Sequence, residues 1–540
     1  MSSTLLMAGV AAAAISCGAP DEASHKWSPP EVLIQPSPFH GVNGLVVDDD
    51  NRLIVGSLFG GQVWSVDRST GAAEIRVDAP YGQSDDVAIS PTGGLAWTSL
   101  LEGKVRYQEK NSDTVQELAS LPSINSIRFD EKTGRLYAAQ VFGADALWEI
   151  DRQGNEPPRL IARDLGGLNG FDVGADGMIY GPLMEKGEVA RVNPENGQVA
   201  VIASGFSMPT GVKIAADGNL WVVDTVGKSL TEVDKTTGEK TSVAKFDGPL
   251  DNLAIGPDGE IYVSDVSRNA IHAYNTKTGE VREVTPPRIA IPAGLGISNG
   301  QLWIANGYVL RSLDTKSNKI NEKFPDIPAA FPFTVSLSED LLAISSTSTN
   351  VVEVFNKRSG ERITQIGNLS GASDAILLSN GNLIYSEYGA GRIVRAYGED
   401  FSKRDTISVN LDGPIQMAAA GTDRLYVTEN SGAVVEVSLS TSQAPRQVVT
   451  GLNKPEGIAL TSWGTLVVAE VGAHRLIEIN PKSGEKAVIA ENLPIGHSVP
   501  SSLPAYAIPT GVALDRDDTI YFSSDVSNAI YKTRLEHGCF

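Results

Sequence analysis

The hydrophobic and polar positions of this chain repeat along almost its whole length. Short runs rich in Val, Ile, Leu and Tyr alternate with turn sequences such as ADGN, PDGE, TTGE and KSGE, and the runs are too short and too closely spaced for helices. Three copies of the repeat begin PTGVKIAADGNLWVVD at Pro209, PLDNLAIGPDGEIYVSD at Pro249 and KPEGIALTSWGTLVVAE at Lys454. The pattern therefore predicts an all-β chain built from repeated units.

One position, just before the first run of each unit, can be followed through all the copies. The steps between successive copies are 40 to 44 residues, except for a last step of 54. The long last step reflects an insertion between Glu491 and Pro509 that contains His497, which we expect to cover the mouth of the second ring. The aligned positions are Asn43, Asp85, Asn125, Asn169, Thr210, Asp251, Ala293, Phe333, Ser373, Ile415, Glu456 and Thr510.

Each unit has room for four short strands, which is the signature of a β-propeller blade. Twelve blades exceed the roughly 4–8 blades of a single ring, so the sequence predicts two six-bladed β-propellers in tandem. A division into seven and five blades is the structural alternative. We place the first propeller at residues 27–277 and the second at residues 278–540.

The ring closures are also predicted from the sequence. A strand-like segment, EVLIQ (Glu31 to Gln35), precedes the first unit, and the last unit stops after its third strand. We expect EVLIQ to complete blade six and EVREV (Glu280 to Val284) to complete blade twelve, which would leave neither ring with an open sheet edge.

The N-terminal 26 residues have the pattern of an export signal. Leu5 to Ile15 form an apolar run that is too short to span a membrane, and small residues follow it. The segment AISC, which ends at Cys17, also resembles a lipoprotein cleavage box, in which Cys17 would carry a lipid anchor. The alternative is an uncleaved apolar N-terminus on a cytoplasmic protein. We expect an exported chain without a membrane span, because no other run approaches about 18 apolar residues.

Charge and cysteine content exclude several functions. The 44 Lys and Arg residues against 65 Asp and Glu give a net charge of −21, which would repel nucleic-acid phosphates at long range. The two cysteines, Cys17 and Cys539, show no metal-binding spacing and cannot form a disulfide framework. A small-molecule partner fits this composition better than a nucleic acid does.

The aligned position points toward the central channel of a propeller, and it differs between the two rings. In the first ring all six residues carry a side-chain oxygen, whereas in the second ring half are apolar. A ring of amide and carboxylate oxygens is the donor set that Ca²⁺ requires. The alternative is that these residues merely cap neighbouring backbone. The predicted calcium ligands are Asn43, Asp85, Asn125, Asn169 and Asp251.

The repeat also resembles a known family. The phrases VNGLVVDDDNRLIVGS, GLNGFDVGADGMIYG and PLDNLAIGPDGEIYVSD are similar to the calcium-dependent six-bladed propellers of the gluconolactonase and senescence-marker family, to which paraoxonase is related, and to NHL-like repeats. The resemblance implies a calcium ion held by a glutamate on the first blade, asparagines on the third and fourth, and an aspartate on the fifth. The matching positions here are Asn43, Asn125, Asn169 and Thr210, so the asparagines match and the two carboxylates do not.

If the resemblance extends to activity, calcium would polarise a lactone or ester carbonyl while a nearby base activates water. Asp85 or Asp251, each one blade from a missing acid, would be that base, and His40 lies near the same channel mouth. An ordinary loop histidine is the alternative for His40. The alternatives for the protein are a non-catalytic propeller that recognises a ligand or protein, and a propeller lyase or biosynthetic tailoring enzyme.

A second aligned position, at the end of each second strand, is acidic in several units. In the second ring it holds Glu387, Glu429 and Glu470. These three residues would either form a cation-attracting wall or bond to neighbouring backbone, and we expect the latter.

Overall fold

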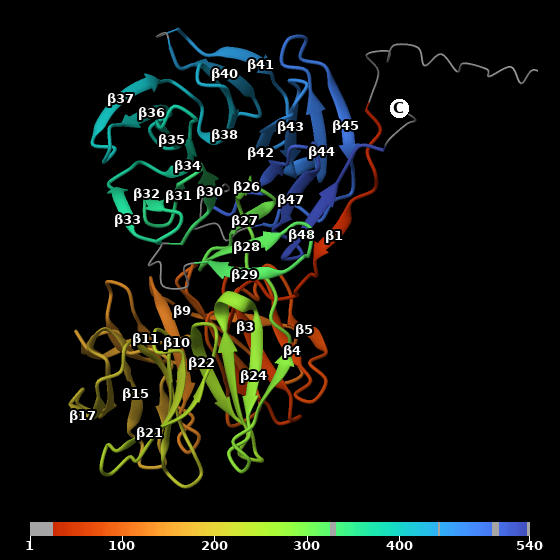
Figure 1. The fold of residues 1–540 in the computed structure, drawn as a ribbon. Coiled ribbons are helices and arrows are strands. Elements are labelled where there is room, and N and C mark those ends of the chain that lie inside the picture. Colours follow the sequence, from red (N-terminus) through yellow and green to blue (C-terminus); the bar gives the residue numbers. More distant parts are fainter. Residues whose placement is uncertain (1–24, 324–330, 441–442, 499–506, 537–540) are drawn as a thin grey trace, which may run out of the picture.

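The computed structural model describes residues 25–323, 331–440, 443–498 and 507–536. The signal segment Leu5 to Ile15 and Cys17 lie outside this range, as does Cys539. The all-β prediction is confirmed, since the described residues form twelve four-stranded antiparallel sheets (Figure 1). No α-helix occurs in the described part, where the helical elements are the 3-10 turns Met184–Lys186 (η1), Val266–Arg268 (η2) and Val471–Ala473 (η3). No described helix is therefore long and apolar enough to cross a membrane.

The first ring contains six sheets, drawn from red to light green in the lower half of Figure 1. In chain order they are β2 (Val42–Val47), β3 (Leu53–Ser57), β4 (Val63–Val66) and β5 (Ala73–Val77); β6 (Val87–Ile89), β7 (Leu95–Ser99), β8 (Lys104–Gln108) and β9 (Val115–Ser120); β10 (Ile124–Phe129), β11 (Leu136–Gln140), β12 (Ala146–Ile150) and β13 (Arg159–Arg163); β14 (Asp172–Val173), β15 (Ile179–Leu183), β16 (Glu188–Val192) and β17 (Val199–Ser204); β18 (Pro209–Ile214), β19 (Leu220–Asp224), β20 (Ser229–Val233) and β21 (Lys240–Lys245); β22 (Leu250–Ile255), β23 (Ile261–Asp265), β24 (Ala270–Tyr274) and β25 (Val281–Thr285).

The second ring contains the other six sheets, drawn in the upper half of Figure 1 from green to blue, except for the strand Glu31–Ile34, which is red. They are β26 (Leu295–Ser298), β27 (Gln301–Ala305), β28 (Leu310–Asp314) and β29 (Ile320–Lys323); β30 (Thr334–Leu337), β31 (Leu341–Ser346), β32 (Val351–Asn356) and β33 (Arg362–Ile366); β34 (Ala372–Leu377), β35 (Leu383–Glu387), β36 (Arg392–Tyr397) and β37 (Lys403–Ser408); β38 (Pro414–Ala420), β39 (Arg424–Glu429), β40 (Val434–Ser438) and β41 (Arg446–Val449); β42 (Pro455–Leu460), β43 (Leu466–Glu470), β44 (Arg475–Ile479) and β45 (Lys486–Ala490); and β46 (Val512–Leu514), β47 (Ile520–Ser524) and β48 (Ala529–Thr533) with β1 (Glu31–Ile34).

The inner strands of each ring contact one another in cyclic order. In the first ring β2, β6, β10, β14, β18 and β22 follow one another, and β22 packs against β2. In the second ring β26, β30, β34, β38, β42 and β46 do the same, and β46 packs against β26. The chain is therefore a pair of six-bladed propellers, as the repeat predicts.

The predicted ring closures are wrong, and the two strands exchange roles. β25 pairs with β24 and completes the sixth sheet, whereas β1 pairs with β48 and completes the twelfth. The reason is chain connectivity, because the tight turn from Asn275 to Glu280 joins β24 to β25, and a short loop costs little entropy to close. The sixth sheet thus extends to Thr285, past the division predicted at residues 277 and 278, and β1 lies on the second ring.

The core of each ring lies between neighbouring sheets. Alternate side chains of a strand face opposite sides of its sheet, so each blade presents apolar residues to both neighbours. Between the second and third sheets, for example, Tyr107, Ile127 and Leu136 are each no more than 1% exposed. The turns use polar chemistry: the Asp234 carboxylate accepts hydrogen bonds from the N–H groups of Thr236 and Thr237 at 2.8 and 2.7 Å.

The two rings are joined by an apolar cluster and by side-chain amides. Phe59 of the first ring packs with Ile291 of the linker and Phe333 of the second ring. The Phe39 carbonyl accepts hydrogen bonds from Asn269 of the first ring at 2.6 Å and from Asn528 of the second at 2.8 Å. Apolar contacts and hydrogen-bonded side-chain amides occur together here, so the two rings share one continuous interface.

Candidate functional site

The aligned positions of the first ring lie where its inner strands begin. Asn43, Asn125, Thr210 and Asp251 are in β2, β10, β18 and β22, while Asp85 and Asn169 come just before β6 and β14. All are buried except Asp251, which is half-buried. The inner strands run in the same direction around the ring, so these residues share one mouth of the channel.

Two of the asparagines converge on one hydroxyl. Ser126 donates a hydrogen bond to Oδ1 of Asn125 at 2.9 Å and to Oδ1 of Asn169 at 3.0 Å. Asn43 donates from Nδ2 to Oδ1 of Asp85 at 3.3 Å. The amide oxygens of Asn125 and Asn169 therefore lie close together, and the Asn43 amide presents its nitrogen to the acid.

Thr210 has a different partner. Its hydroxyl lies 2.8 Å from the Thr225 hydroxyl, which in turn donates to the carbonyl of Leu250 at 2.6 Å. This chain of hydrogen bonds links the inner strands β18 and β22 across a blade boundary. Thr210 thus bonds to a neighbouring side chain, and only through Thr225 to backbone.

The two acids at this mouth influence each other. Burial raises the pKa of Asp85 well above its usual value, and the negative charges of Asp251 and Asp86 raise it further. Burial, and after it the charge of Asp86, raises the pKa of Asp251 to about 7. Asp251 is thus poised to gain or lose a proton near neutral pH.

Tyr308 of the second ring reaches this same mouth. It lies between β27 and β28, and its hydroxyl is 3.0 Å from the point that a Cβ on Gly41 would occupy. The hydroxyl is buried and has no hydrogen-bond partner among the described residues. Burial raises the pKa of Tyr308 well above its usual value, and the charges of Asp251 and Asp85 add to the effect. The sequence does not point to Tyr308, because the repeat does not indicate how one ring is placed on the other.

His40 does not lie with the acids. Its Nε2 is 2.8 Å from the carbonyl oxygen of Asp525, and its ring stacks on His497, both in the second ring. Burial, and after it the charge of His497, lowers the pKa of His40 to about 3. His40 is therefore neutral and belongs to the interface between the rings. His497 also contacts the first ring, with its Nε2 2.9 Å from the carbonyl of Phe59, so this part of the insertion lies between the rings. Ile508, near the end of the insertion, belongs to the apolar cluster that contains Ala293 and Phe333 at the mouth of the second ring.

The channel of the second ring is more apolar. Ala293, Phe333 and Ile415 are buried there, and the carboxylate of Glu456 accepts a hydrogen bond from the N–H of Thr510 at 2.6 Å. Burial and the charge of Asp525 raise the pKa of Glu456 well above its usual value. The second ring therefore has no counterpart of the first ring's set of oxygen-bearing residues.

The three glutamates of the second ring bond to backbone, as expected. Glu387, Glu429 and Glu470 accept hydrogen bonds from the N–H groups of Ser370, Asp412 and Asn453 at 2.8 to 3.0 Å. Each carboxylate thus fixes the loop that enters its own blade. They do not form an open acidic wall.

The donor chemistry at the mouth of the first ring suits a hard cation. The described residues contain no group of three or more His, Cys, Asp or Glu side chains that could hold a metal, so a site here would depend on two carboxylates and on amide oxygens. Asp85 and Asp251 raise each other's free energy when both are charged, and a divalent cation would relieve that repulsion. The oxygens of Asn125 and Asn169 are neutral ligands of the kind that calcium accepts. Oδ1 of Asn169 also accepts from the N–H of Gly170 at 2.8 Å, so this oxygen would exchange a hydrogen bond for the metal.

Comparison with known families supports the resemblance drawn from the sequence. Residues 86–308 match the family described as SMP-30/Gluconolactonase/LRE-like region. The matched segment starts just after Asp85 and ends at Tyr308, so it contains four of the aligned oxygen-bearing residues, Asn125, Asn169, Thr210 and Asp251. No curated protein matches the chain.

Among solved structures, the chain resembles two large proteins at low sequence identity. The extracellular domain of a hybrid two-component system from B. thetaiotaomicron is 11% identical, with a TM-score of 0.35, and the match covers 95% of this chain and 83% of that one. The tricorn protease is also 11% identical, with a TM-score of 0.37, and the match covers 92% of this chain and 61% of that one.

Proposed function

We propose that the first ring is a calcium-dependent hydrolase of lactone or ester bonds whose site lies at the mouth covered by Tyr308. The observation that carries the proposal is the pair of electrostatically coupled acids, Asp85 and Asp251, beside the convergent oxygens of Asn125 and Asn169. The match of residues 86–308 to a gluconolactonase-like family supports the same chemistry.

Each residue has a role in this proposal. Asp85, Asn125 and Asn169 would hold the calcium ion, which when bound polarises a carbonyl and stabilises a developing oxyanion. Asp251, with a pKa of about 7, takes a proton from the attacking water. The free hydroxyl of Tyr308 donates to the substrate and orients it.

The second ring shapes access to the site. Leu58 and Phe59, on the loop after β3, pack against Ile291 and Phe333 and close the mouth on the side of the first blade. Phe142 and Val226, on loops of the third and fifth blades, are 61% and 62% exposed. We expect substrate to enter over the third to fifth blades, where these side chains are exposed.

Calcium titration of metal-stripped protein by calorimetry tests the proposal. We expect saturable binding that is lost in Asn169→Ala and kept in the matched control Asn155→Ala, whose residue is exposed in the same ring. Simple lactones should then be hydrolysed with release of acid, measured by pH-stat. Absence of binding at millimolar calcium would contradict the proposal.

The second ring covers one side of the mouth of the first ring. This arrangement favours a second candidate function, in which the propeller recognises a ligand or protein without turnover. Calcium binding without hydrolysis of any lactone or ester would support this candidate. Products that lack an added water molecule would instead indicate a lyase or tailoring enzyme.

Export by residues 1–26 belongs to the same proposal. Cell fractionation of the full chain, compared with Cys17→Ala, tests it. A lipid anchor would place the parent in the membrane fraction and release the variant, whereas a cleaved signal would release both. Retention of both proteins in the cytoplasm would contradict export.

A further inference from the structure

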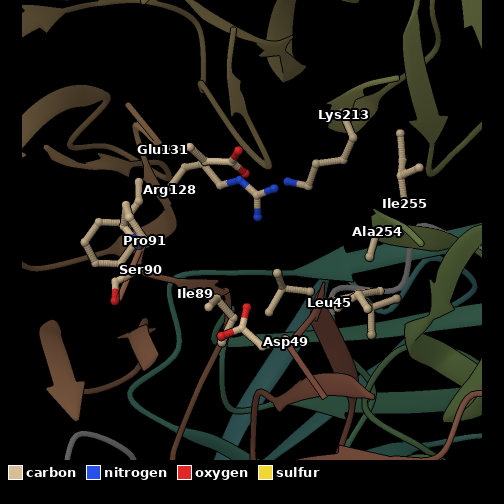
Figure 2. Close-up of a pocket in the computed structure, with 13 residues that line it drawn as sticks. Leu45, Asp49, Ile89, Ser90, Pro91, Arg128, Glu131, Lys213, Ala254 and Ile255 are labelled. Carbon is tan, nitrogen blue, oxygen red and sulfur yellow. The ribbon is translucent and has the colours of Figure 1, made fainter. Parts of the chain in front are cut away.

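The inner strands of the first ring carry a second set of channel residues, three positions after the first set. Three consecutive blades place charged residues there, namely Arg128 in β10, Asp172 in β14 and Lys213 in β18. These residues lie toward the opposite end of the channel, where the inner strands end. A cavity of about 440 Å³ opens at that end, and both cationic side chains line it (Figure 2).

Two carboxylates near this cavity, the half-buried Asp172 and the buried Asp86, already have full sets of donors. Asp172 accepts from Nε of Arg128 and from the N–H groups of Val173 and Ile214, at 2.9 to 3.0 Å. Asp86, on the adjoining turn of the channel, accepts from two backbone N–H groups and from the Asn252 amide, at 2.9 to 3.1 Å. Neither acid needs a further partner.

The two cations, in contrast, have donors to spare. Lys213 is 3% exposed, and its ammonium donates to one acceptor, the carbonyl of Phe171 at 3.1 Å. Arg128 uses Nε for Asp172, and its two terminal nitrogens have no acceptor among the described residues. Figure 2 shows the guanidinium and the ammonium approaching each other from opposite sides of the cavity. Burial, and after it the charge of Arg128, lowers the pKa of Lys213 to about 8, so each cation disfavours the other.

We propose that this cavity binds a small monocarboxylate with an apolar body, held between Arg128 and Lys213. A carboxylate accepts two hydrogen bonds from the fork of a guanidinium and further ones from an ammonium, which matches the unused donors. Leu45, Ile89 and Phe129 supply apolar walls, and the volume is within the range of small-molecule sites.

The surrounding charges favour one negative charge over two. Asp86 and Asp172 balance Arg128 and Lys213, and Asp49 and Glu131 add two carboxylates to the lining of the cavity, of which Asp49 is paired with Lys110 at 2.9 Å. This balance opposes any anion at long range, so binding depends on short-range donation from the two cations, and a phosphate dianion would meet about twice the repulsion of a monocarboxylate. The inference stands apart from the proposed hydrolase, because it uses the other end of the channel and neither Arg128 nor Lys213 belongs to the proposed metal site.

Calorimetry with matched ligands tests the proposal on the intact protein. We expect 4-methylpentanoate to bind saturably and the isosteric 4-methylpentanamide to bind at least about tenfold more weakly, since the amide lacks the charge that the cations recognise. Inorganic phosphate should not compete. Absence of saturable binding of the acid, equal binding of acid and amide, or tighter binding of phosphate would each overturn the proposal.

Variants locate the bound acid. Lys213→Met and Arg128→Lys should each weaken binding about ten- to a hundredfold, while Lys132→Met, an exposed lysine outside the cavity lining, should leave it unchanged. Thermal unfolding shows whether each variant is folded, and the comparison of acid and amide on the parent decides the matter if one is not. Unchanged binding in both folded cavity variants would contradict the proposal and leave the cations as a purely structural link between blades.

Discussion

The imidazole ring of His40 in the first propeller stacks on that of His497 in the second, with ring centroids 4.4 Å apart and an interplanar angle of 13°. Each histidine is also bound to a backbone carbonyl of the opposite propeller, at 2.8 and 2.9 Å. The pair therefore connects the two rings in two ways: the imidazole faces stack, and a nitrogen at the edge of each imidazole bonds to the opposite ring. Two positive charges at this distance would repel, so the contact depends on the neutral form of His40.

Acidification should lower the free energy of unfolding, because His40 becomes protonated on unfolding. Its pKa is lowered from 6.5 to about 3, so the folded state resists a proton that the unfolded chain takes up. The stability that neutral His40 confers is present above pH 6.5 and is lost as the pH falls toward 3, by about 2 kcal/mol between pH 7 and pH 5.

Denaturant unfolding at these two pH values checks this prediction. The loss should be smaller in His40→Asn than in the parent, and the control His25→Asn, which changes a more exposed histidine, should behave like the parent. Buried acids with raised pKa values make the protein more stable as the pH falls, which opposes the effect of His40. The test is therefore the loss of stability in His40→Asn compared with the loss in the parent, and not the loss in the parent alone. An equal loss in His40→Asn and the parent would contradict the assignment.

Asp251→Asn should stabilise the metal-free protein at pH 8. The folded pKa of about 7 means that Asp251 is charged at an energetic cost at pH 8, and this contribution disappears below the usual pKa near 4. Allowing for the partial exposure of the carboxyl group, we expect a gain of about 1–3 kcal/mol at pH 8 and none at pH 4. Chemical unfolding measures it, with the exposed Asp217→Asn as control. A destabilised variant at pH 8 would show that the charged form has an unrecognised partner.

Tyr308→Phe separates structure from activity at the covered mouth. The buried hydroxyl lacks a partner, so its removal should raise the free energy of unfolding by about 1 kcal/mol. If the hydroxyl orients substrate, the same variant should lower kcat by about tenfold or more. Thermal unfolding and lactone turnover together check both. Lower stability in the variant would mean that the hydroxyl is bonded after all.

Ile34→Asp tests which ring the N-terminal strand completes. Ile34 is 5% exposed and packs with Leu302 and Ile530, so a carboxylate there should cost about 3 kcal/mol or more. Hydrogen exchange should speed up in β46 to β48 and stay unchanged in β22 to β25. Val32→Asp, at a position 42% exposed, serves as the control. Faster exchange in β22 to β25 alone would favour the opposite closure.

Most of the fold could be predicted because it is local. Each blade is a succession of short hairpins, and apolar periodicity with turn residues such as Asp234 to Gly238 marks them directly. Ring closure is not local: β1 pairs with a strand almost 500 residues later, and no feature of EVLIQ distinguishes that partner from the sixth blade.

The candidate site, too, could be predicted only in part. The register of the repeat places Asn125, Asn169, Asp85 and Asp251 at one mouth, because the aligned position recurs at the start of each inner strand. Tyr308 could not be predicted, since its role depends on how the second ring is docked. The sequence could have indicated Arg128, Asp172 and Lys213, because they follow the aligned position by three residues in consecutive units.

The closure of the twelfth sheet by β1 makes the second propeller a discontinuous domain, with the whole first propeller inserted between its first strand and the rest. During synthesis the first ring has all its strands once Thr285 has emerged, whereas β1 is made first and must wait for β48. We expect a fragment covering residues 36–288 to fold alone. A fragment beginning at residue 286 would lack one strand and present an open sheet edge, which is a known route to aggregation.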